Sequence, residues 1–129
     1  MLQGYFYQSV ENKIFDRTEF EVSIEQRIRF NEKSAIFGGH FPGNPVVPGV
    51  CQVQMVREVM EAVLQKILLL TDADTIKFTN MINPVDYPEI TIIIKSKLIS
   101  DEIFQVNAVF QESDTVFTKF SGKFKIYQL

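Results

Sequence analysis

The chain has 129 residues, of which 46% are hydrophobic and 22% are charged, and its formal net charge is −3 at pH 7. This composition is typical of a soluble globular protein and argues against a disordered chain. The small negative charge provides no general attraction to nucleic acid or to anionic lipid. We therefore expect residues 1–129 to form a single domain that has neither as its partner.

The sequence carries no recognisable targeting feature. The N-terminal stretch MLQGYFYQSV lacks the basic and apolar regions of a secretion signal, and no apolar run approaches the roughly 18–20 residues that cross a bilayer. The only cysteine, Cys51, cannot form an internal disulfide and has no metal-ligand spacing around it. It is predicted to be a small buried residue rather than a reactive thiol. These features favour a cytoplasmic protein that binds no metal.

The first predicted element is a β-strand over residues 20–30, FEVSIEQRIRF. Apolar and polar residues alternate along it, which is typical of a strand with one buried face. The residues expected to face the core are Phe20, Val22, Ile24, Ile28 and Phe30.

A long helix is predicted next, over residues 48–69. Pro48 suits the first helical turn, where a missing N–H costs nothing. Apolar residues then recur at helical spacing, and their stripe is wide enough to indicate a helix that is enclosed on most sides. The residues of this stripe are Val50, Val53, Val56, Met60, Val63, Leu64 and Ile67, widened by Met55, Val59 and Leu68.

Four further strands are predicted over residues 74–82, 90–99, 103–111 and 115–127, and Ile76, Phe78 and Ile82 are expected to point inward from the first of them. The polar stretches ISDEI and QESDT are typical of turns between neighbouring strands, so we expect an antiparallel meander. The whole order predicts an α+β fold in which one antiparallel sheet curls around one long helix.

The segment GGHFPGNPVVPGV, residues 38–50, contains the only histidine together with four of the six glycines and three of the five prolines. Glycine permits unusual backbone torsions and proline fixes its own, so this loop is expected to hold a group in place. The loop ends at a helix N-terminus, whose free N–H groups favour negative charge. An imidazole beside such donors is suited to removing a proton next to a carbonyl and to stabilising the enolate that forms.

The stretch HFPGNPVVPGV, His40 to Val50, closely resembles the signature of the 3-hydroxyacyl-(acyl carrier protein) dehydratases, and every fixed position of that signature is met. A weaker match is KFTNMINPVDYPE, Lys77 to Glu89, in which Tyr-Pro-Glu stands where the family usually has Pro-Gly-Asp. The resemblance implies a single hotdog domain over essentially the whole chain, and a reaction that needs no metal or organic cofactor.

The resemblance also implies roles for three residues. His40 would remove the proton from the carbon next to a thioester carbonyl, and the Gly49 N–H would bind that carbonyl. In the family, an acid five positions after this glycine protonates the departing hydroxyl and acts across a dimer interface. Here that position is Gln54, a neutral amide that can orient a hydroxyl or a water but cannot supply a proton.

Glu58 lies one helical turn after Gln54, where the family often carries a glutamine, so the pair looks exchanged. Either Glu58 replaces the missing acid, or it is a solvated or interface carboxylate beside Arg57. One turn is about 5.4 Å of rise, which is large against hydrogen-bond tolerance and counts against the first interpretation. Gln52, three residues after Gly49, resembles a dehydratase-like subset associated with specialised acyl and polyene pathways, in which the acid position also varies.

Further residues are expected near the substrate if the hotdog fold is right. Phe41, Pro48 and Val50 are the predicted substrate-binding residues. Phe37 and Phe78 are additional candidates for lining an acyl channel, although core packing explains phenylalanines equally well.

The leading hypothesis is therefore a lyase that converts 3-hydroxyacyl groups on acyl carrier protein to trans-2-enoyl thioesters. One alternative is a hotdog thioesterase, which is disfavoured because hydrolysis usually needs a carboxylate to activate water and position 54 lacks one. Another is a non-catalytic acyl-binding subunit that pairs with an active homologue. An exposed sheet edge predicts at least a dimer. The outward lysines of the last strand, candidates for contact with acyl carrier protein or simply a solvated face, are Lys119, Lys123 and Lys125.

Overall fold

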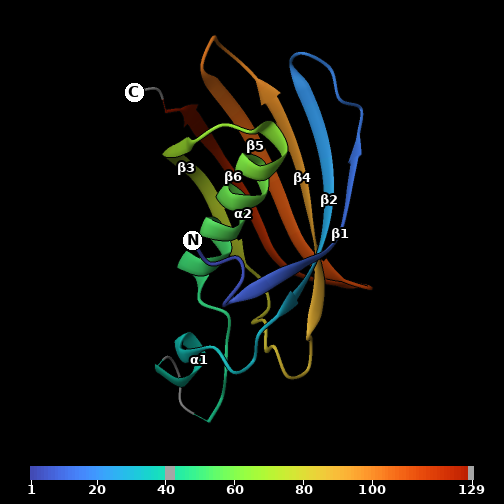
Figure 1. The fold of residues 1–129 in the computed structure, drawn as a ribbon, viewed down its shortest axis with the longest axis vertical. Coiled ribbons are helices and arrows are strands. Elements are labelled where there is room, and N and C mark those ends of the chain that lie inside the picture. The colour runs from blue at the N-terminus through green and yellow to red at the C-terminus, as the bar shows by residue number, and fades with distance from the viewer. Residues whose placement is uncertain (40–42, 128–129) are drawn as a thin grey trace.

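Six β-strands form one antiparallel sheet that curves around a long helix (Figure 1). This computed structural model describes residues 1–39 and 43–127. The elements in chain order are β1 (Tyr7–Phe15), β2 (Glu21–Phe30), α1 (Ala35–Gly39), α2 (Gly49–Leu64), β3 (Leu68–Phe78), β4 (Glu89–Leu98), β5 (Ile103–Glu112) and β6 (Thr115–Ile126). In the sheet they lie in the order β1-β2-β4-β5-β6-β3. The predicted α+β fold, with an antiparallel sheet around one helix, is confirmed.

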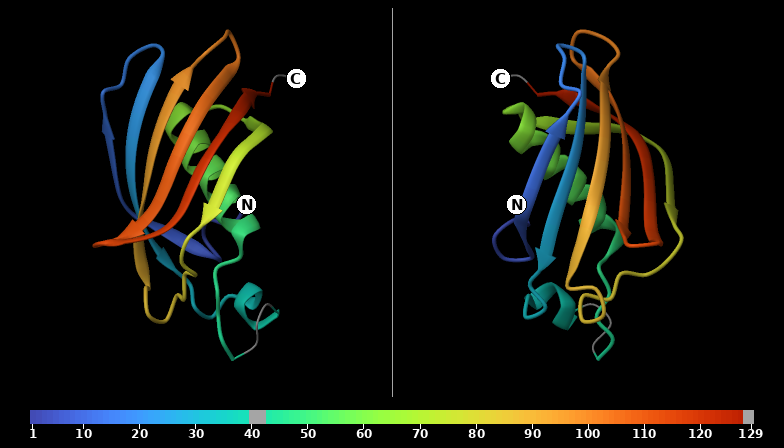
Figure 2. Two further views of the ribbon diagram at one scale, coloured as in Figure 1. Left: turned by 180° about the vertical axis from the view of Figure 1, so that it is seen from behind. Right: turned by 90° about the vertical axis from the view of Figure 1, so that its right-hand side faces the viewer.

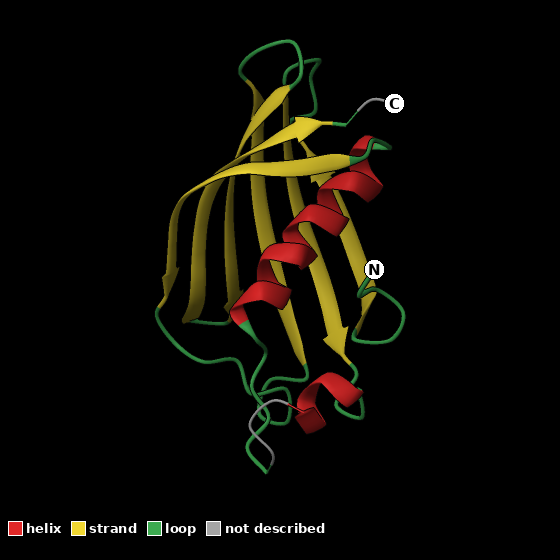
Figure 3. Ribbon diagram, turned by 90° about the vertical axis from the view of Figure 1, so that its left-hand side faces the viewer, coloured by secondary structure: helices red, strands yellow, loops and turns green. Residues whose placement is uncertain are grey.

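Figures 2 and 3 show that α2 lies against the concave face of the sheet, and the buried hydrophobic cluster combines side chains of both. Ile90, Ile92 and Ile94 of β4 are fully buried, because every second residue of a strand points to the same side. The α2 residues in the same buried cluster are Cys51, Met55, Val56, Val59 and Met60. Each large apolar side chain that is fully buried contributes about 1.5–3 kcal/mol, so this layer holds sheet and helix together.

Four of the five predicted strands agree with the structure to within one residue at each end. They are the strands predicted over residues 20–30, 90–99, 103–111 and 115–127, which correspond to β2, β4, β5 and β6. The pairing of β4 with β5, and of β5 with β6, is antiparallel as expected. In the described part of the chain, no helix has both the length and the apolar character that a membrane crossing requires.

The helix prediction is right at its N-terminus and wrong at its C-terminus. α2 ends at Leu64, more than one turn earlier than predicted, because Gln65 adopts a left-handed conformation (φ 55°, ψ 46°). The Gln65 N–H donates to the Glu61 carbonyl at 2.9 Å. The Glu61 carboxylate in turn accepts the N–H of Leu68 at 2.8 Å. The chain reverses here, and Leu68 already belongs to β3.

The strand predicted over residues 74–82 is shifted, since β3 is Leu68–Phe78. β3 pairs with β6 and not with β4, so the expected meander is limited to β4, β5 and β6. The β3 backbone lies so close to β6 that a Cβ atom on Gly122 would lie 2.5 Å from the Asp72 carbonyl oxygen. The glycine is therefore required at this pairing position.

Strand β1 and the short helix α1 were not predicted. Only Tyr7 of β1 is buried, so this edge strand has no apolar alternation that could reveal it. Hydrogen bonds from Gln26 of β2, which is 5% exposed, hold β1 instead. Gln26 Nε2 donates to Ser9 Oγ at 2.6 Å, and Gln26 Oε1 accepts from Asn12 Nδ2 at 2.6 Å.

Two phenylalanines expected in the core are on the surface. Phe20, which precedes β2, and Phe78, at the end of β3, are each 54% exposed. The other inward residues predicted for β2 are buried, and so is Ile82. Phe20 directly precedes β2 and Phe78 is the last residue of β3, and Phe78 has a second role described below.

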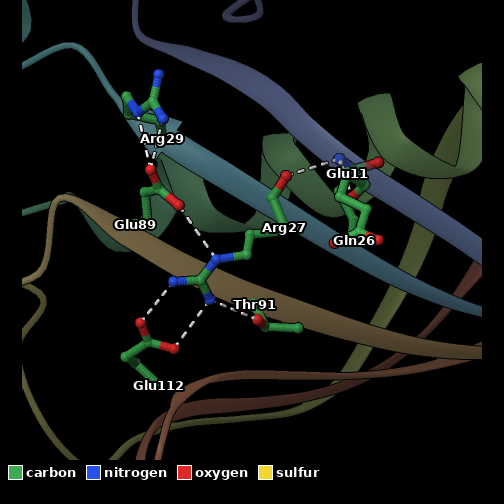
Figure 4. Close-up of polar contacts among 7 residues, drawn as sticks. All are labelled: Glu11, Gln26, Arg27, Arg29, Glu89, Thr91 and Glu112. Carbon is green, nitrogen blue, oxygen red and sulfur yellow. Dashed lines mark hydrogen bonds and ion pairs between the residues drawn. The ribbon is translucent and has the colours of Figure 1, made fainter.

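The outer face of the sheet carries a network of ion pairs centred on Arg27 (Figure 4). The Arg27 guanidinium binds both carboxylate oxygens of Glu112, at 3.0 and 2.8 Å, and also Glu89 at 3.1 Å. Glu89 in addition accepts from Arg29 at 2.6 Å. Hydrogen bonding to Arg27 lowers the pKa of Glu112. The two arginines are thus neutralised by neighbours on β4 and β5, and this part of the surface is not a free cationic patch.

Candidate active site

The N-terminus of α2 presents backbone donors to a pocket. Pro48 is extended (φ −62°, ψ 145°) and precedes the helix without a side-chain cap. Its carbonyl accepts the N–H groups of Cys51 and Gln52, each at 3.1 Å. The N–H groups of Gly49 and Val50, the first two of the helix, have no intrahelical acceptor. Among residues 1–39 and 43–127, neither N–H group has a backbone acceptor.

The Phe78 ring lies against the backbone at position 49. A Cβ atom there would lie 2.6 Å from Cζ of Phe78, whose ring covers the backbone at the helix start. A side chain at this position would therefore require the exposed Phe78 ring to move. This close approach also gives Phe78 a place beside the candidate site, in agreement with the expectation that it lines a channel.

Two pockets meet at Gly49 and Phe78. The first, called the Gly49 pocket here, has a volume of about 410 Å³ and is mainly apolar; its lining residues are Gly49, Val50, Val53, Gln54, Arg57, Leu70, Ile76, Phe78 and Phe124. The second, called the Pro48 pocket, has a volume of about 360 Å³; its lining residues are Val46, Val47, Pro48, Gly49, Gln52, Phe78, Thr79, Asn80 and Met81.

Gly49, Val50 and Gln54 therefore line one pocket, and Pro48 lines the second pocket, which shares Gly49 and Phe78 with the first. Val50 is 78% exposed, so it lies at the rim of the Gly49 pocket. His40 and Phe41 lie outside the described residues. Their predicted roles rest on the sequence motif alone.

Glu58 is the most heavily hydrogen-bonded side chain near the site. It is only 2% exposed. Its carboxylate accepts from the backbone N–H groups of Leu2 and Gln3, each at 2.9 Å, from Tyr7 Oη at 3.1 Å, and from Gln54 Nε2 at 2.9 Å. Burial raises the pKa of Glu58, but these four donors outweigh burial and leave its pKa below the ordinary value.

This geometry corrects the expectations for Glu58. The carboxylate is buried, so it is not a solvated group beside Arg57. It lines a separate pocket of about 280 Å³ with Gln3 and Tyr7, not the Gly49 pocket. A carboxylate with a lowered pKa and four donors is also a poor proton donor, so Glu58 does not take over the acid position.

The hydrogen-bond donors that the N-terminal segment provides to Glu58 were not predicted from the sequence. Two of them are backbone N–H groups, which leave no trace in side-chain patterns. Tyr7 was the only available signal, because a buried phenol needs a polar partner. The carboxylate of Glu58 raises the pKa of Tyr7 further above the increase that burial causes.

Gln52 is buried, and both ends of its side-chain amide are hydrogen-bonded within the protein. It is 3% exposed, its Nε2 donates to the Val47 carbonyl at 3.3 Å, and its Oε1 accepts from the Thr118 hydroxyl. The Val47 N–H donates to the Ile82 carbonyl at 2.9 Å. Gln52 thus ties the loop before α2 to β6 and holds the start of the helix in place.

Other expected residues have different outcomes. Cys51 is 7% exposed, and burial raises the pKa of its thiol, so the prediction of a small buried residue is confirmed. Phe37 does not line either pocket that Phe78 lines; it is 4% exposed and stacks on Phe6 with ring centroids 4.9 Å apart. Of the outward lysines, Lys123 forms an ion pair with Asp74 at 3.1 Å.

The Glu58 hydrogen bonds predict an acid-dependent stability. Because its pKa is lowered on folding, this carboxylate stabilises the fold above its ordinary pKa of about 4.3 and loses that contribution as pH falls through its folded pKa. Glu58→Gln offers only one acceptor oxygen, so we expect it to lower the unfolding free energy at neutral pH by about 1–3 kcal/mol. The difference from the wild type should shrink in acid.

Denaturant unfolding at a series of pH values measures this difference. Glu61→Gln, which makes the same charge change one turn along the helix, is the control and should show a smaller loss. Equal losses at acid and neutral pH would contradict the assignment of Glu58 as an ionised buried group.

Comparison with known protein families identifies the family of this chain. The sequence model of the ApeI-like family, described as ApeI dehydratase, matches residues 16–120, which include α2 and the proline- and glycine-rich loop before it. The chain belongs to the ApeI-like dehydratase family. A curated relative of this ApeI-like chain is the 3-hydroxyacyl-(acyl-carrier-protein) dehydratase FabZ of Oenococcus oeni, with 29% identity over 95 residues. That match covers 68% of the chain and 66% of the relative, just under two thirds of its length.

Solved structures share the fold of the ApeI-like chain. An uncharacterized protein from Erwinia carotovora subsp. atroseptica has a TM-score of 0.64 and 23% identity, covering 94% of this chain and 95% of the other. The dehydratase heterocomplex ApeI:P from Xenorhabdus doucetiae has a TM-score of 0.62 and 18% identity, covering 91% and 96%. A putative thioesterase from Silicibacter has a TM-score of 0.53 and 10% identity, covering 92% and 80%. The expected hotdog fold is confirmed.

Proposed function

We propose that this chain dehydrates 3-hydroxyacyl thioesters carried on acyl carrier protein to trans-2-enoyl thioesters. The observation that carries the proposal is that Gly49, within the dehydratase-like motif, and Gln54, four residues after that motif, line one apolar pocket. Membership of a dehydratase family supports it.

The proposed reaction assigns one task to each polar group. His40 takes the proton from carbon 2, next to the thioester carbonyl. The Gly49 N–H donates to the carbonyl oxygen, where negative charge develops in the enolate. Gln54 binds the hydroxyl on carbon 3. When the C3–O bond breaks, the departing hydroxide takes up the proton that His40 removed from carbon 2, so that water leaves, neutral His40 is restored and the enoyl thioester remains.

The pocket fits an acyl chain. The residues that α2, β3 and β6 contribute to the Gly49 pocket are mostly aliphatic or aromatic, and Val50 and Phe78 at its rim are exposed. Ligand pockets of this kind bury apolar surface and orient the ligand by few polar groups. We include Val50 and Pro48 as proposed substrate contacts, together with Phe41 of the motif.

The proposal includes an oligomer. β3 is an edge strand with one free side, and Leu69, Leu70 and Phe78 on it are exposed. Exposed apolar edges favour association with another chain. A homodimer or larger homo-oligomer in the cytoplasm, served by acyl carrier protein, is the arrangement that we propose.

A second function is favoured by one observation. Gln54 cannot donate a proton, and the ApeI:P structure is named as a heterocomplex of dehydratase chains. This chain would then bind the acyl group while a related chain completes the catalytic site. Purification together with a homologous dehydratase would distinguish this function from that of an active homo-oligomer.

The test is turnover of a 3-hydroxyacyl-acyl carrier protein by the purified protein, followed by mass spectrometry of the carrier. Loss of water with the thioester intact is the expected result. Release of free carrier thiol would instead identify a thioesterase. An unchanged substrate would overturn the proposal in favour of an acyl-binding subunit.

A further inference from the structure

We propose that Glu58 is a positioning residue that turns the side-chain oxygen of Gln54 toward the Gly49 pocket, and that this orientation selects 3-hydroxyacyl over 3-oxoacyl groups. The inference rests on the proposed function, because it names the substrate feature that the same pocket recognises. It concerns the polarity of one amide, which has a donor end and an acceptor end.

The orientation of Gln54 follows from its partner. Nε2 of Gln54 lies 2.9 Å from Oε2 of Glu58. An ionised carboxylate only accepts hydrogen bonds, so the NH₂ end of the amide must face it. The carbonyl end then points away from Glu58. Since Gln54 lines the Gly49 pocket and Glu58 does not, that carbonyl oxygen is the end left for a ligand.

The carboxylate is itself fixed before any substrate binds. Leu2 and Gln3 donate to its two oxygens, and Tyr7 adds a third donor from β1. The N-terminal segment is anchored in turn, because Phe6 is fully buried and its N–H donates to the Leu2 carbonyl at 2.9 Å. Glu58 therefore has little freedom to follow a rotation of the Gln54 amide.

The pocket-lining residues then include several donors, namely the Gly49 and Val50 N–H groups and the Arg57 guanidinium, and Gln54 Oε1 is the side-chain acceptor that we assign to the group on carbon 3. The Gly49 N–H can bind a thioester carbonyl, and Gln54 Oε1 can accept a hydrogen bond from a hydroxyl. A 3-oxo group carries no hydrogen and would face this oxygen lone pair to lone pair. The enoyl product also lacks the hydroxyl, so it loses the Gln54 contact once water has left. A site built to bind a hydroxyl rejects analogues without one, because its own polar group is then left unpaired.

The binding experiment uses 3-hydroxyacyl and 3-oxoacyl pantetheine thioesters of one chain length. The wild type should bind the hydroxy thioester about 10-fold more tightly, as expected for one hydrogen bond gained or lost. In Glu58→Gln, residue 58 can accept or donate, so Gln54 can turn its NH₂ toward a ketone. The preference should fall to about 2-fold or less.

Tyr7→Phe is the matched control. It removes a donor from Glu58 and weakens the same buried cluster, but it leaves the carboxylate facing Gln54. It should retain the hydroxyl preference, which a merely structural role of Glu58 would not predict. Loss of the preference in Tyr7→Phe but not in Glu58→Gln would overturn the inference.

A spectroscopic measurement separates this inference from the proposed function. The side-chain NH₂ signals of Gln54, assigned by their loss in Gln54→Glu, should shift in Glu58→Gln and stay nearly unchanged in Tyr7→Phe. If neither thioester binds the wild type, the proposed function fails while these signals still report the Gln54–Glu58 contact. If the signals are the same in the wild type and in Glu58→Gln, Glu58 does not orient Gln54.

Discussion

Replacement of His40 by alanine is expected to lower the rate of water loss by about 10²–10⁴-fold, the usual contribution of a general base. His40 is the only imidazole in the chain, and the described residues that line the Gly49 pocket include no other group that titrates near neutral pH. Turnover of the 3-hydroxyacyl carrier by the wild type and by the variant measures this effect.

The controls separate catalysis from folding. The role proposed for His40 is catalytic, so the variant should keep the unfolding midpoint of the wild type. Substrate affinity should change much less than the rate, because Gly49 and Gln54 remain in place. A variant with wild-type turnover would remove His40 from the mechanism and, with it, the role inferred from the motif.

The fold was predictable where one face of an element packs against the core. The alternation in β2, β4, β5 and β6 is a direct record of burial, and it located these strands to within one residue. Where burial is weak, the record disappears: only Tyr7 of β1 is buried, and β1 is held by backbone pairing with β2 and by the Gln26 side chain. The end of α2 was predicted too far along the chain for a related reason: leucines such as Leu68 are compatible with a strand as well as with the apolar face of a helix.

The pocket residues at and just after the motif could be predicted from the sequence, whereas the hydrogen bonds that hold Glu58 could not. Gly49 and Gln54 follow from the spacing of the motif, and the structure places both on one pocket. The state of Glu58 depends on Leu2 and Gln3, which lie more than fifty residues away and donate through backbone N–H groups. No side-chain pattern reports such a contact. The same sequence distance explains why Glu58 was expected at the surface.

The exchange of acid and amide between positions 54 and 58 has a physical consequence. A carboxylate at position 58 is buried and ionised by its donors, whereas position 54 faces the pocket. The negative charge of this pair therefore lies on Glu58, outside the Gly49 pocket, and the member of the pair that lines the pocket, Gln54, is neutral. Whether catalysis needs a proton from position 54 is decided by placing a carboxyl group there.

Gln54→Glu is expected to raise the dehydration rate by about 10-fold or more, within the range that general acids contribute. The new carboxyl group would lie where Nε2 of Gln54 now lies 2.9 Å from Glu58. Two carboxylates at this distance cannot both ionise easily, so the pair should share a proton and titrate with one raised pKa. Because Glu58 keeps three other donors, the proton should reside mainly on residue 54, beside the pocket.

The shared proton should also make the unfolding free energy of Gln54→Glu depend on pH. A carboxyl whose pKa is raised on folding stabilises the protein below its unfolded pKa, and the contribution is lost as pH rises through the folded pKa. Gln54→Glu should therefore compare best with the wild type near about pH 5 and worst above about pH 8, where both groups ionise. Denaturant unfolding across this range measures the effect, and the rate gain should fall off over the same alkaline limb.

The double variant Gln54→Glu/Glu58→Gln tests whether the proton shared with Glu58 causes the rate gain of Gln54→Glu. It restores the order of acid and amide that the motif family carries, but it removes the second carboxylate that holds the proton. The carboxyl group introduced at position 54 would then face an amide donor and ionise at its ordinary pKa or below, so the rate gain of the double variant at neutral pH should be smaller than that of Gln54→Glu alone. A Gln54→Glu enzyme slower than the wild type would contradict the prediction, and it would mean that accepting the substrate hydroxyl, rather than protonating it, is the work of position 54.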